Sequence, residues 1–263
     1  MPAALSDFSE LRDLLGRRAY GCAFVIPVYN HPRTIRQVAS DAAATGCRVW
    51  VVDDGSTDET PRALEGLEGV TVIRHEVNRG KGAALRTGMQ AAADAGLRWV
   101  VTVDADGQHL VSEAVRLLRL VAQAPERPAI VLGCRQGMLA GKVPWTSRWG
   151  RRWSSFWVWM AGGSWVSDSQ SGFRLYPVPE TLQLPARCAR FQFEMEVLVD
   201  AHRAGIPILS AEVSVEYAPP GGRVSHLDPW TDFWRNTRMI LRLMLKRLLP
   251  RPALPTKVDP HAP

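Results

Sequence analysis

The chain is 263 residues long, and 46% of its residues are hydrophobic and 22% charged. A chain of this length and composition buries one sizeable core, which excludes an extensively disordered protein. The net charge of +6 favours an anionic partner: a nucleic acid, a negatively charged membrane surface or a phosphorylated substrate.

Signals for secretion and membrane spanning are not found in the sequence. The N-terminus lacks the basic and apolar regions of a signal peptide, and no stretch approaches the ~20 apolar residues that a spanning helix requires. The four cysteines are widely separated and form no CxxC pair, so we expect reduced, buried thiols rather than disulfides or a zinc site. We therefore expect a cytoplasmic protein.

Strand and helix patterns alternate at short spacing through the first half of the chain. A short accessory helix is expected within residues 1–18, before a main domain over residues 19–217. Apolar, β-branched runs predict strands at 22–26, 48–52, 70–74, 100–103 and 129–133. Between them we expect a helix over 60–67, an alanine-rich helix that ends near residue 95 and a helix over 110–121. This alternation predicts an α/β fold with a predominantly parallel sheet that helices cover on both faces.

The second half of the chain differs in composition. Residues 142–165 form an aromatic and basic segment, in which tryptophan recurs every four residues at Trp145, Trp149, Trp153 and Trp157. A helix over 191–203 and a strand over 207–217 follow. Residues 218–249 comprise a flexible loop and an amphipathic helix that begins at 230, and we expect the proline-rich tail at 250–263 to be disordered.

Two acidic residues follow the strand at 100–103. If the chain stays extended there, Asp104, Asp106 and Gln108 point the same way, because strand side chains alternate between faces. Two carboxylates and an amide oxygen suit an oxygen-preferring cation such as Mg²⁺ or Mn²⁺. The alternative is a solvated turn with Gly107 as its tight residue.

Two further loops fall at strand ends, where ligands bind in parallel sheets. Asp53 and Asp54 offer acceptors to a nucleobase N–H or a ribose hydroxyl; as an alternative, they serve as turn and cap residues of the next helix. The segment 78–82 (Asn-Arg-Gly-Lys-Gly) opens a helix and offers Lys81 and backbone N–H groups to phosphate. A tight turn into the helix is the alternative for this segment, which matches neither a Walker A loop nor a Rossmann fingerprint.

Five segments together form a more specific pattern than any one of them. They are Val25-Ile26-Pro27-Val28-Tyr29-Asn30, Val52-Asp53-Asp54-Gly55-Ser56-Thr57-Asp58, Asn78-Arg79-Gly80-Lys81-Gly82-Ala83-Ala84, Asp104-Ala105-Asp106-Gly107-Gln108 and Ser171-Gly172-Phe173-Arg174. In this order, over about residues 21–217, they resemble family 2 glycosyltransferases of the GT-A fold, and most of all the dolichyl-phosphate mannosyltransferase-like branch.

The resemblance implies a nucleotide-sugar donor, a UDP- or GDP-sugar, and a divalent cation, Mg²⁺ or Mn²⁺. It implies that the nucleoside is held by Pro27, Tyr29, Asp53 and Asp54. It implies that the cation, which bridges the donor diphosphate, is held by Asp104, Asp106 and Gln108. Arg135 and Arg174 would face phosphates. A cation and arginines suit this chemistry because negative charge builds on the leaving diphosphate.

The acceptor decides whether a general base is needed. In the branch that this chain resembles, the acceptor is often a lipid phosphate, which is already ionised. A neutral hydroxyl of another lipid or of a glycan would instead require a carboxylate, and the candidates are Asp168, Glu194 and Glu196. Because Glu194 and Glu196 lie two apart on a predicted helix, at most one is expected to line the site, and we favour Glu194.

The chain departs from the family pattern in two places. His31 replaces the usual glutamate, which leaves the preferred nucleotide open. The segment 222–226 stands where the branch has a basic loop ending in Ser-Lys; Arg223 and His226 are suited to close over the diphosphate, and neutral His226 to bind the cation. An ordinary surface loop is the alternative for this segment.

Two segments suit a membrane interface: residues 142–165 and the helix over 230–249. On the helix, Arg235, Arg238, Arg242 and Lys246 form one basic stripe beside broad apolar surface. We expect peripheral association with anionic lipids at the inner face of the cell membrane. Packing of the helix against the sheet or against a homodimer partner is the alternative.

The sequence therefore predicts a metal-dependent, inverting glycosyltransferase that acts on a lipid phosphate or another membrane-associated acceptor. A nucleotidyltransferase would need a glycine- and arginine-rich loop after Ile26, which is absent. A nucleic-acid-binding protein would explain the charge but not the paired acids at two strand ends, so we expect no nucleic-acid partner. A non-catalytic nucleotide-binding protein would not need the full set of metal ligands.

Overall fold

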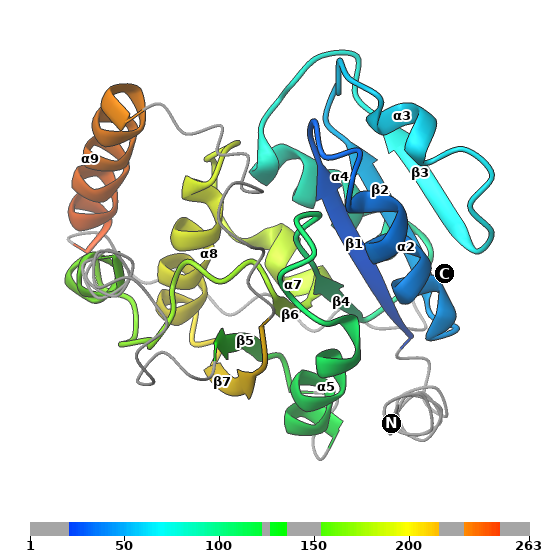
Figure 1. The fold of residues 1–263 in the computed structure, drawn as a ribbon. Coiled ribbons are helices and arrows are strands. Elements are labelled where there is room, and N and C mark those ends of the chain that lie inside the picture. The colour runs from blue at the N-terminus through cyan, green and yellow to red at the C-terminus, as the bar shows by residue number, and fades with distance from the viewer. Residues whose placement is uncertain (1–20, 123–126, 136–153, 216–228, 248–263) are drawn as a thin grey trace.

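A mostly parallel seven-stranded sheet forms the centre of the computed structural model, which describes residues 21–122, 127–135, 154–215 and 229–247 (Figure 1). The strand order is β3-β2-β1-β4-β6-β5-β7. Only β6 runs antiparallel, to β4 and β5. The strands are β1 (Cys22–Val28), β2 (Arg48–Asp53), β3 (Val70–Arg74), β4 (Trp99–Thr102), β5 (Ile130–Arg135), β6 (Arg174–Pro177) and β7 (Ile208–Val213).

Helices cover both faces of this sheet. One face packs on α2 (Ile35–Ala44) and α5 (Ala114–Ala122), which follows the short helix η1 (Val111–Glu113). The other packs on α4 (Lys81–Asp94), α7 (Val178–Gln183) and α8 (Gln192–Arg203). In β1, Phe24 belongs to the first core and Val25 to the second, because strand side chains alternate. Both faces are thus buried, which explains why the strands read as continuous apolar runs.

The predicted α/β fold and its strands at 22–26, 48–52, 70–74, 100–103 and 129–133 are confirmed to within one or two residues at their ends. The sequence analysis missed β6 and α7. The strand β6 has only four residues, begins with an arginine and ends with a proline, so it carries no apolar run. The predicted helix over 60–67 is shorter, as α3 (Thr60–Ala63), and the predicted strand over 207–217 is shorter, as β7.

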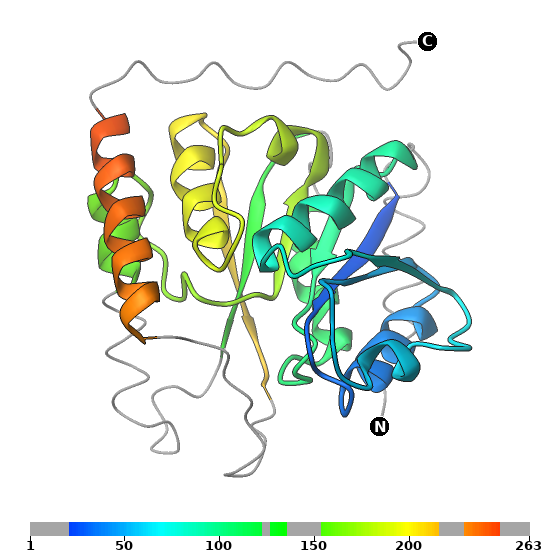
Figure 2. The same cartoon turned by 90° about the horizontal axis from the view of Figure 1, so that it is seen from above.

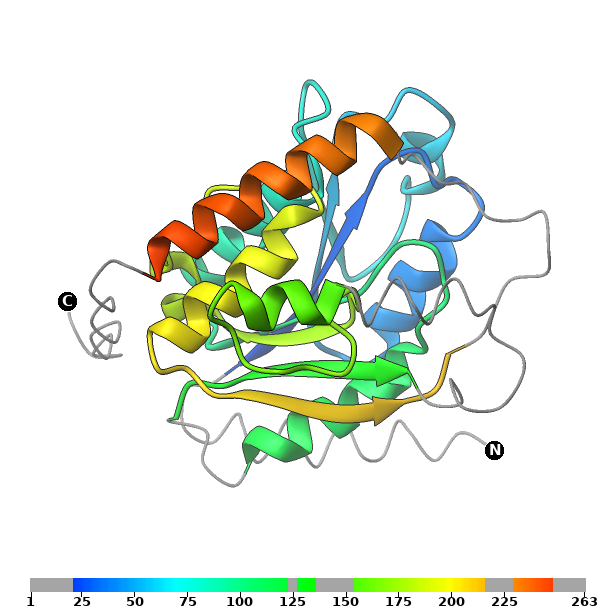
Figure 3. The same ribbon diagram turned by 90° about the vertical axis from the view of Figure 1, so that its left-hand side faces the viewer.

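The amphipathic helix is found as α9 (Pro229–Lys246), and it packs along α8 at the end of the sheet opposite β3 (Figures 2 and 3). Met239 and Leu243 are the buried contacts of α9 with the core. Across the described ranges, no helix has the length and apolar character needed to cross a bilayer. The four cysteines are free thiols. The expected accessory helix, the loop at 218–228, the tail at 250–263 and residues 142–153 lie outside the described residues.

Candidate functional site

A turn follows β4 and carries the two predicted metal-binding acids. The chain does not stay extended there: Gly107 has a φ of 71°, and the N–H of Gln108 donates to Oδ1 of Asp106 at 3.0 Å. The hydroxyl of Thr34 donates to the carbonyl of Ala105 at 2.5 Å and so fixes the turn to the start of α2. The chain therefore forms the turn at Gly107 that was the alternative to an extended segment, and this turn leaves Asp104 and Asp106 partly exposed, with Gln108 more deeply buried.

Lys81 joins three elements at this edge of the sheet. Its Nζ lies 2.7 Å from Oδ1 of Asp104 and 2.9 Å from Oε2 of Glu194, which projects from α8. Burial alone would lower the pKa of the Lys81 ammonium, but the two carboxylates outweigh it and raise that pKa well above its usual value. Burial likewise opposes ionisation of Asp104, and Lys81 still holds the pKa of its carboxyl below the usual range. The ammonium of Lys81 and the carboxylate of Asp104 are thus both charged at neutral pH.

The chain segment before β6 packs directly against Asp104. The hydroxyl of Thr102 donates to the carbonyl of Gly172 at 2.7 Å, which brings the two backbones together. A Cβ at position 172 would lie 2.3 Å from Oδ2 of Asp104, so only glycine fits here without displacing that carboxylate. In the sequence, Gly172 is visible only as part of a motif, and no local pattern there indicates its contact with Asp104.

The acids fit a divalent cation. Burial and the neighbouring Asp104 carboxylate both raise the pKa of Asp106, a repulsion that a bound cation would relieve. Across the described ranges no group of three His, Cys, Asp or Glu side chains forms a metal cluster, so protein acids alone do not complete a coordination sphere. Gln108, water or the donor's phosphate oxygens would supply the remaining oxygen ligands that Mg²⁺ or Mn²⁺ takes. His226 lies outside the described residues, as does Arg223.

Asp53 and Asp54 play different parts at the end of β2. Both oxygens of Asp54 are used: Oδ2 accepts from the N–H of Gly80 at 2.7 Å, and Oδ1 from the N–H of Arg79 at 2.9 Å and from Nδ1 of His75 at 2.7 Å. Within the part of the chain that the structure describes, Asp53 accepts one hydrogen bond, from the N–H of Ser56 to Oδ1 at 2.9 Å. Its Oδ2 has an ion pair at 3.4 Å but no hydrogen bond. Oδ2 of Asp53 is thus a buried acceptor atom without a hydrogen bond, whereas Asp54 holds the loop that leads to Lys81.

The end of β1 lies beside this loop. Pro27 pairs in register with Val52, and partly exposed Tyr29 follows β1. The N–H of Asn30, which has a φ of 55°, donates to the hydroxyl of Ser56 at 3.0 Å. The structure therefore brings Pro27 and Tyr29 to the same sheet edge as Asp53, as the sequence analysis expects for a nucleoside pocket.

Arg135 and Asp168 form a bidentate ion pair at the end of β5. Nε of Arg135 lies 2.7 Å from one carboxylate oxygen and Nη2 lies 3.0 Å from the other. Asp168 is fully buried, whereas Arg135 is partly exposed. Because both oxygens of Asp168 already bind the guanidinium, its geometry fits the fixing of Arg135 better than proton transfer.

Arg174 does not face the site, which corrects the expectation from the sequence. It is fully buried, and its guanidinium donates to the carbonyls of Ser171, Ser169 and Glu194 at 2.6–2.7 Å and to the hydroxyl of Tyr176 at 3.2 Å. The reason is local: the side chain at the first position of β6 points into the core under α8. Arg174 therefore joins the segment 169–171 to α8 and does not reach a phosphate.

Comparison with known proteins decides the family. The sequence model of Glycosyl transferase family 2 matches residues 23–176, which is more than half of the chain. The chain belongs to glycosyl transferase family 2. It is thus a glycosyltransferase, and the matched range includes both acidic loops, Lys81 and Gly172.

Two relatives show the branch of this glycosyltransferase. The UDP-N-acetylglucosamine–dolichyl-phosphate N-acetylglucosaminyltransferase of Methanococcus voltae is 27% identical over 212 residues, which cover 73% of this chain and 84% of that protein. The dolichyl-phosphate beta-glucosyltransferase of Mus musculus is 29% identical over 256 residues, which cover 85% of this chain and 74% of that protein. The expected kinship with dolichyl-phosphate sugar transferases is confirmed.

A solved structure shows the fold of the glycosyltransferase. Glucosyl-3-phosphoglycerate synthase from Mycobacterium tuberculosis, in complex with Mn²⁺ and UDP-glucose, superimposes with a TM-score of 0.65 and 20% identity, covering 91% of this chain and 82% of that one. The expected GT-A architecture is confirmed by this likeness.

Glu194 and Glu196 project from α8 toward different neighbours, as their spacing predicts. Glu194 contacts Lys81, while fully buried Glu196 accepts from the backbone N–H groups of Arg187 and Cys188 at 2.8 and 2.7 Å. Of the two, only Glu194 belongs to the acid and lysine cluster around Asp104. His75, which bonds to Asp54, was not predicted as a site residue. Its position directly after β3, where ligands of parallel sheets bind, is the sequence feature that could have indicated it.

Proposed function

We propose that this glycosyltransferase moves a sugar from a UDP- or GDP-sugar to a lipid phosphate, with a divalent cation and with inversion at the sugar carbon. The observation that supports it best is the cluster of Asp104, Lys81 and Glu194, with Asp106 beside it, at the carboxyl end of the sheet. Ligands of open α/β sheets bind at this edge.

The donor diphosphate is proposed to lie between the cation and the basic side chains. Asp104 and Asp106, with Gln108, would hold Mg²⁺ or Mn²⁺, which when bound offsets charge on the leaving diphosphate. Lys81 keeps Asp104 ionised and in place, and Arg135, held by Asp168 at the end of β5, would contact a phosphate. Asp53 would accept a hydrogen bond from the nucleoside.

An ionised acceptor fits this site better than a neutral hydroxyl. The two candidate bases near the site are both paired with cations, Glu194 with Lys81 and Asp168 with Arg135. A phosphate oxygen needs no proton removed, so attack on the sugar carbon requires neither carboxylate as a base. The relatives that act on dolichyl phosphate support the same acceptor class. Transfer to a hydroxyl of another lipid or of a glycan is the second candidate.

Nucleotide binding tests the donor half of the proposal. We expect UDP- or GDP-sugars to raise the melting temperature of the full chain with Mn²⁺ present, and to lose most of that effect with a chelator. A panel of UDP-, GDP- and dTDP-sugars, each with and without Mn²⁺, identifies the base. If no nucleotide stabilises the protein in a metal-dependent way, the proposal is wrong.

We propose that α9 and the helical residues 154–160 rest on the membrane surface that carries the acceptor. Large apolar side chains are exposed on these segments and beside them, at Trp159, Trp165, Leu241, Met244 and Leu245. Arg247 joins the two segments through its bond to the carbonyl of Met160 at 2.8 Å. Of the predicted basic stripe, Arg242 and Lys246 bind acids of α8, whereas Arg238 is exposed. Exposed basic and apolar groups together suit an anionic interface.

Vesicle binding tests the membrane half. The full chain is expected to co-sediment with vesicles containing anionic phospholipid at low salt, and to bind neutral vesicles several-fold less because each basic contact adds about 1 kcal/mol. A chain that stays in the supernatant with anionic vesicles, or that sediments as a dimer without lipid, would favour a protein partner for this face.

A further inference from the structure

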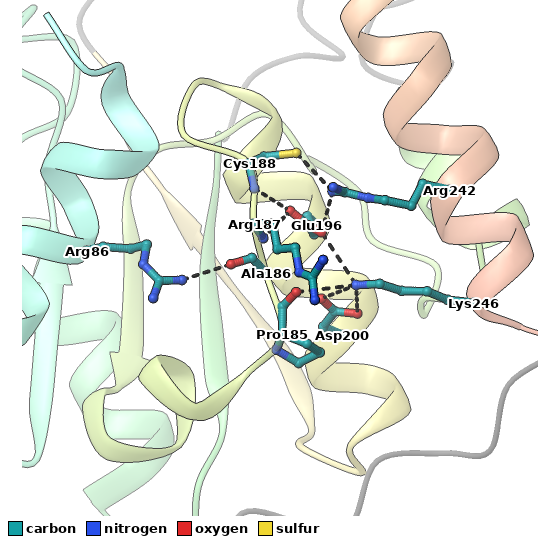
Figure 4. Close-up of polar contacts among 9 residues, drawn as sticks. All are labelled: Arg86, Pro185, Ala186, Arg187, Cys188, Glu196, Asp200, Arg242 and Lys246. Atoms are coloured by element: carbon teal, nitrogen blue, oxygen red, sulfur yellow. Dashed lines mark hydrogen bonds and ion pairs between the residues drawn. The ribbon is translucent and has the colours of Figure 1, made fainter.

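Glu196 lies at the centre of a polar cluster that joins α9 to the body of the protein (Figure 4). Its Oε1 lies 2.5 Å from Nη2 of Arg242 and 3.4 Å from Nζ of Lys246, both on α9. Its Oε2 accepts the N–H groups of Arg187 and Cys188. Lys246 also binds Asp200, one turn further along α8, at 2.9 Å. One buried carboxylate therefore holds both α9 and the segment 187–188.

The segment that Glu196 holds continues directly to the start of α4. The carbonyl of Ala189 accepts the N–H of Ala83 at 2.8 Å. A Cβ at Gly80 would lie 2.6 Å from that same carbonyl, and one at Gly82 would lie 2.4 Å from Cβ of Phe193. The segment 188–193 and the first turn of α4 are thus in close contact, and the two glycines permit this approach.

The first turn of α4 carries Lys81. The N-cap residue of α4, Gly80, is fixed from the other side, because its N–H donates to Oδ2 of Asp54 at 2.7 Å. The ammonium of Lys81 then reaches Asp104 and Glu194. A continuous set of contacts therefore runs from Arg242 on α9, through Glu196 and Ala189, to the lysine that binds the proposed metal ligand.

We propose that Glu196 is a positioning residue for sugar transfer, which couples the seating of α9 to the placement of Lys81 at the donor site. This inference rests on the proposed function, because it names the reaction that the coupling serves. It assigns Glu196 no contact with substrate. Its buried charge is compensated by two backbone donors and two cations, so a neutral replacement leaves the two cations without their counter-charge and removes one of the two acceptor oxygens.

If Glu196 is coupled to the first turn of α4, a change at Glu196 must alter that turn. Glu196→Gln keeps the size of the side chain but removes its charge and places an amide N–H₂ against Arg242 and Lys246 or against the two backbone donors. In the full chain, we expect hydrogen exchange in residues 80–85 to accelerate by about tenfold or more, while residues 22–28 of β1 stay protected. The value of kcat/KM for the nucleotide sugar should fall by about tenfold.

Two further variants keep the test decisive. Arg242→Gln removes one partner from the α9 side, where the side chain is 41% exposed, and should accelerate exchange in residues 80–85 in the same direction but less. Asp94→Asn, which changes an exposed acid on α4 that contacts Gln90, is the matched control and should change neither exchange nor kcat/KM. Faster exchange confined to residues 80–85 and 187–193 supports the coupling.

The opposite results would overturn it. Unchanged exchange at 80–85 in both Glu196→Gln and Arg242→Gln, or equal acceleration in 22–28, means that Glu196 only stabilises the fold. If the wild-type chain transfers no sugar, the proposed function is wrong, and the exchange data alone decide whether Glu196 positions Lys81.

Discussion

Asp106→Asn is expected to reduce turnover by about three orders of magnitude and to leave the fold intact. The carboxylate of Asp106 accepts a hydrogen bond from the N–H of Gln108, and an amide oxygen can accept that bond equally well. What the variant loses is charge, at the place where the neighbouring Asp104 already makes a second negative charge costly. A cation that compensates this repulsion would lose a strong ligand.

The measurement compares turnover, metal-dependent nucleotide binding and melting temperature. Asp106→Asn should lose turnover and metal-dependent nucleotide binding, and its melting temperature should stay within a few degrees of that of the wild type. Asp41→Asn, an exposed acid on α2 that contacts Gln37, is the control and should leave all three unchanged. A loss of the fold in Asp106→Asn would instead indicate that the acid serves only the turn.

The sequence was sufficient to predict most of the sheet. Strands buried on both faces read as apolar, β-branched runs, and β1, β2 and β4 all show this pattern. The strand β6 could not be predicted in this way, because a short antiparallel strand between β4 and β5 takes its stability from neighbours that are distant in sequence.

The candidate site was predictable in its residue types but not in the direction of each side chain. The order of the motifs indicated that Asp53, Lys81 and Asp104 meet at one edge. Whether an arginine faces that edge or the core depends on tertiary packing, and the sequence did not indicate that Arg174 is buried under α8. The role of Glu196 depends on where α9 packs, and no local pattern gives that.

Gly172→Ala is expected to reduce turnover by about a hundredfold or more through one methyl group. The added Cβ would lie 2.3 and 2.5 Å from the two oxygens of Asp104, which is closer than Cβ atoms in proteins approach other heavy atoms. The backbone of Gly172 is fixed to Thr102 at 2.7 Å, so the carboxylate is the part that moves. Its displacement would break the 2.7 Å contact with Lys81 and misplace a proposed metal ligand.

A second glycine separates this local effect from a loss of stability. Gly88 lies in α4, and a Cβ there would come within 2.4 Å of Cγ1 of Val25, in the core and away from the acids. Gly88→Ala should therefore cost about 1–3 kcal/mol of stability by overpacking, measured as a lower denaturation midpoint. Its turnover per folded molecule should be close to that of the wild type. Gly172→Ala should show the reverse, a small change in midpoint and a large loss of turnover. Equal losses of turnover in both would mean that general destabilisation, and not the position of Asp104, limits the reaction.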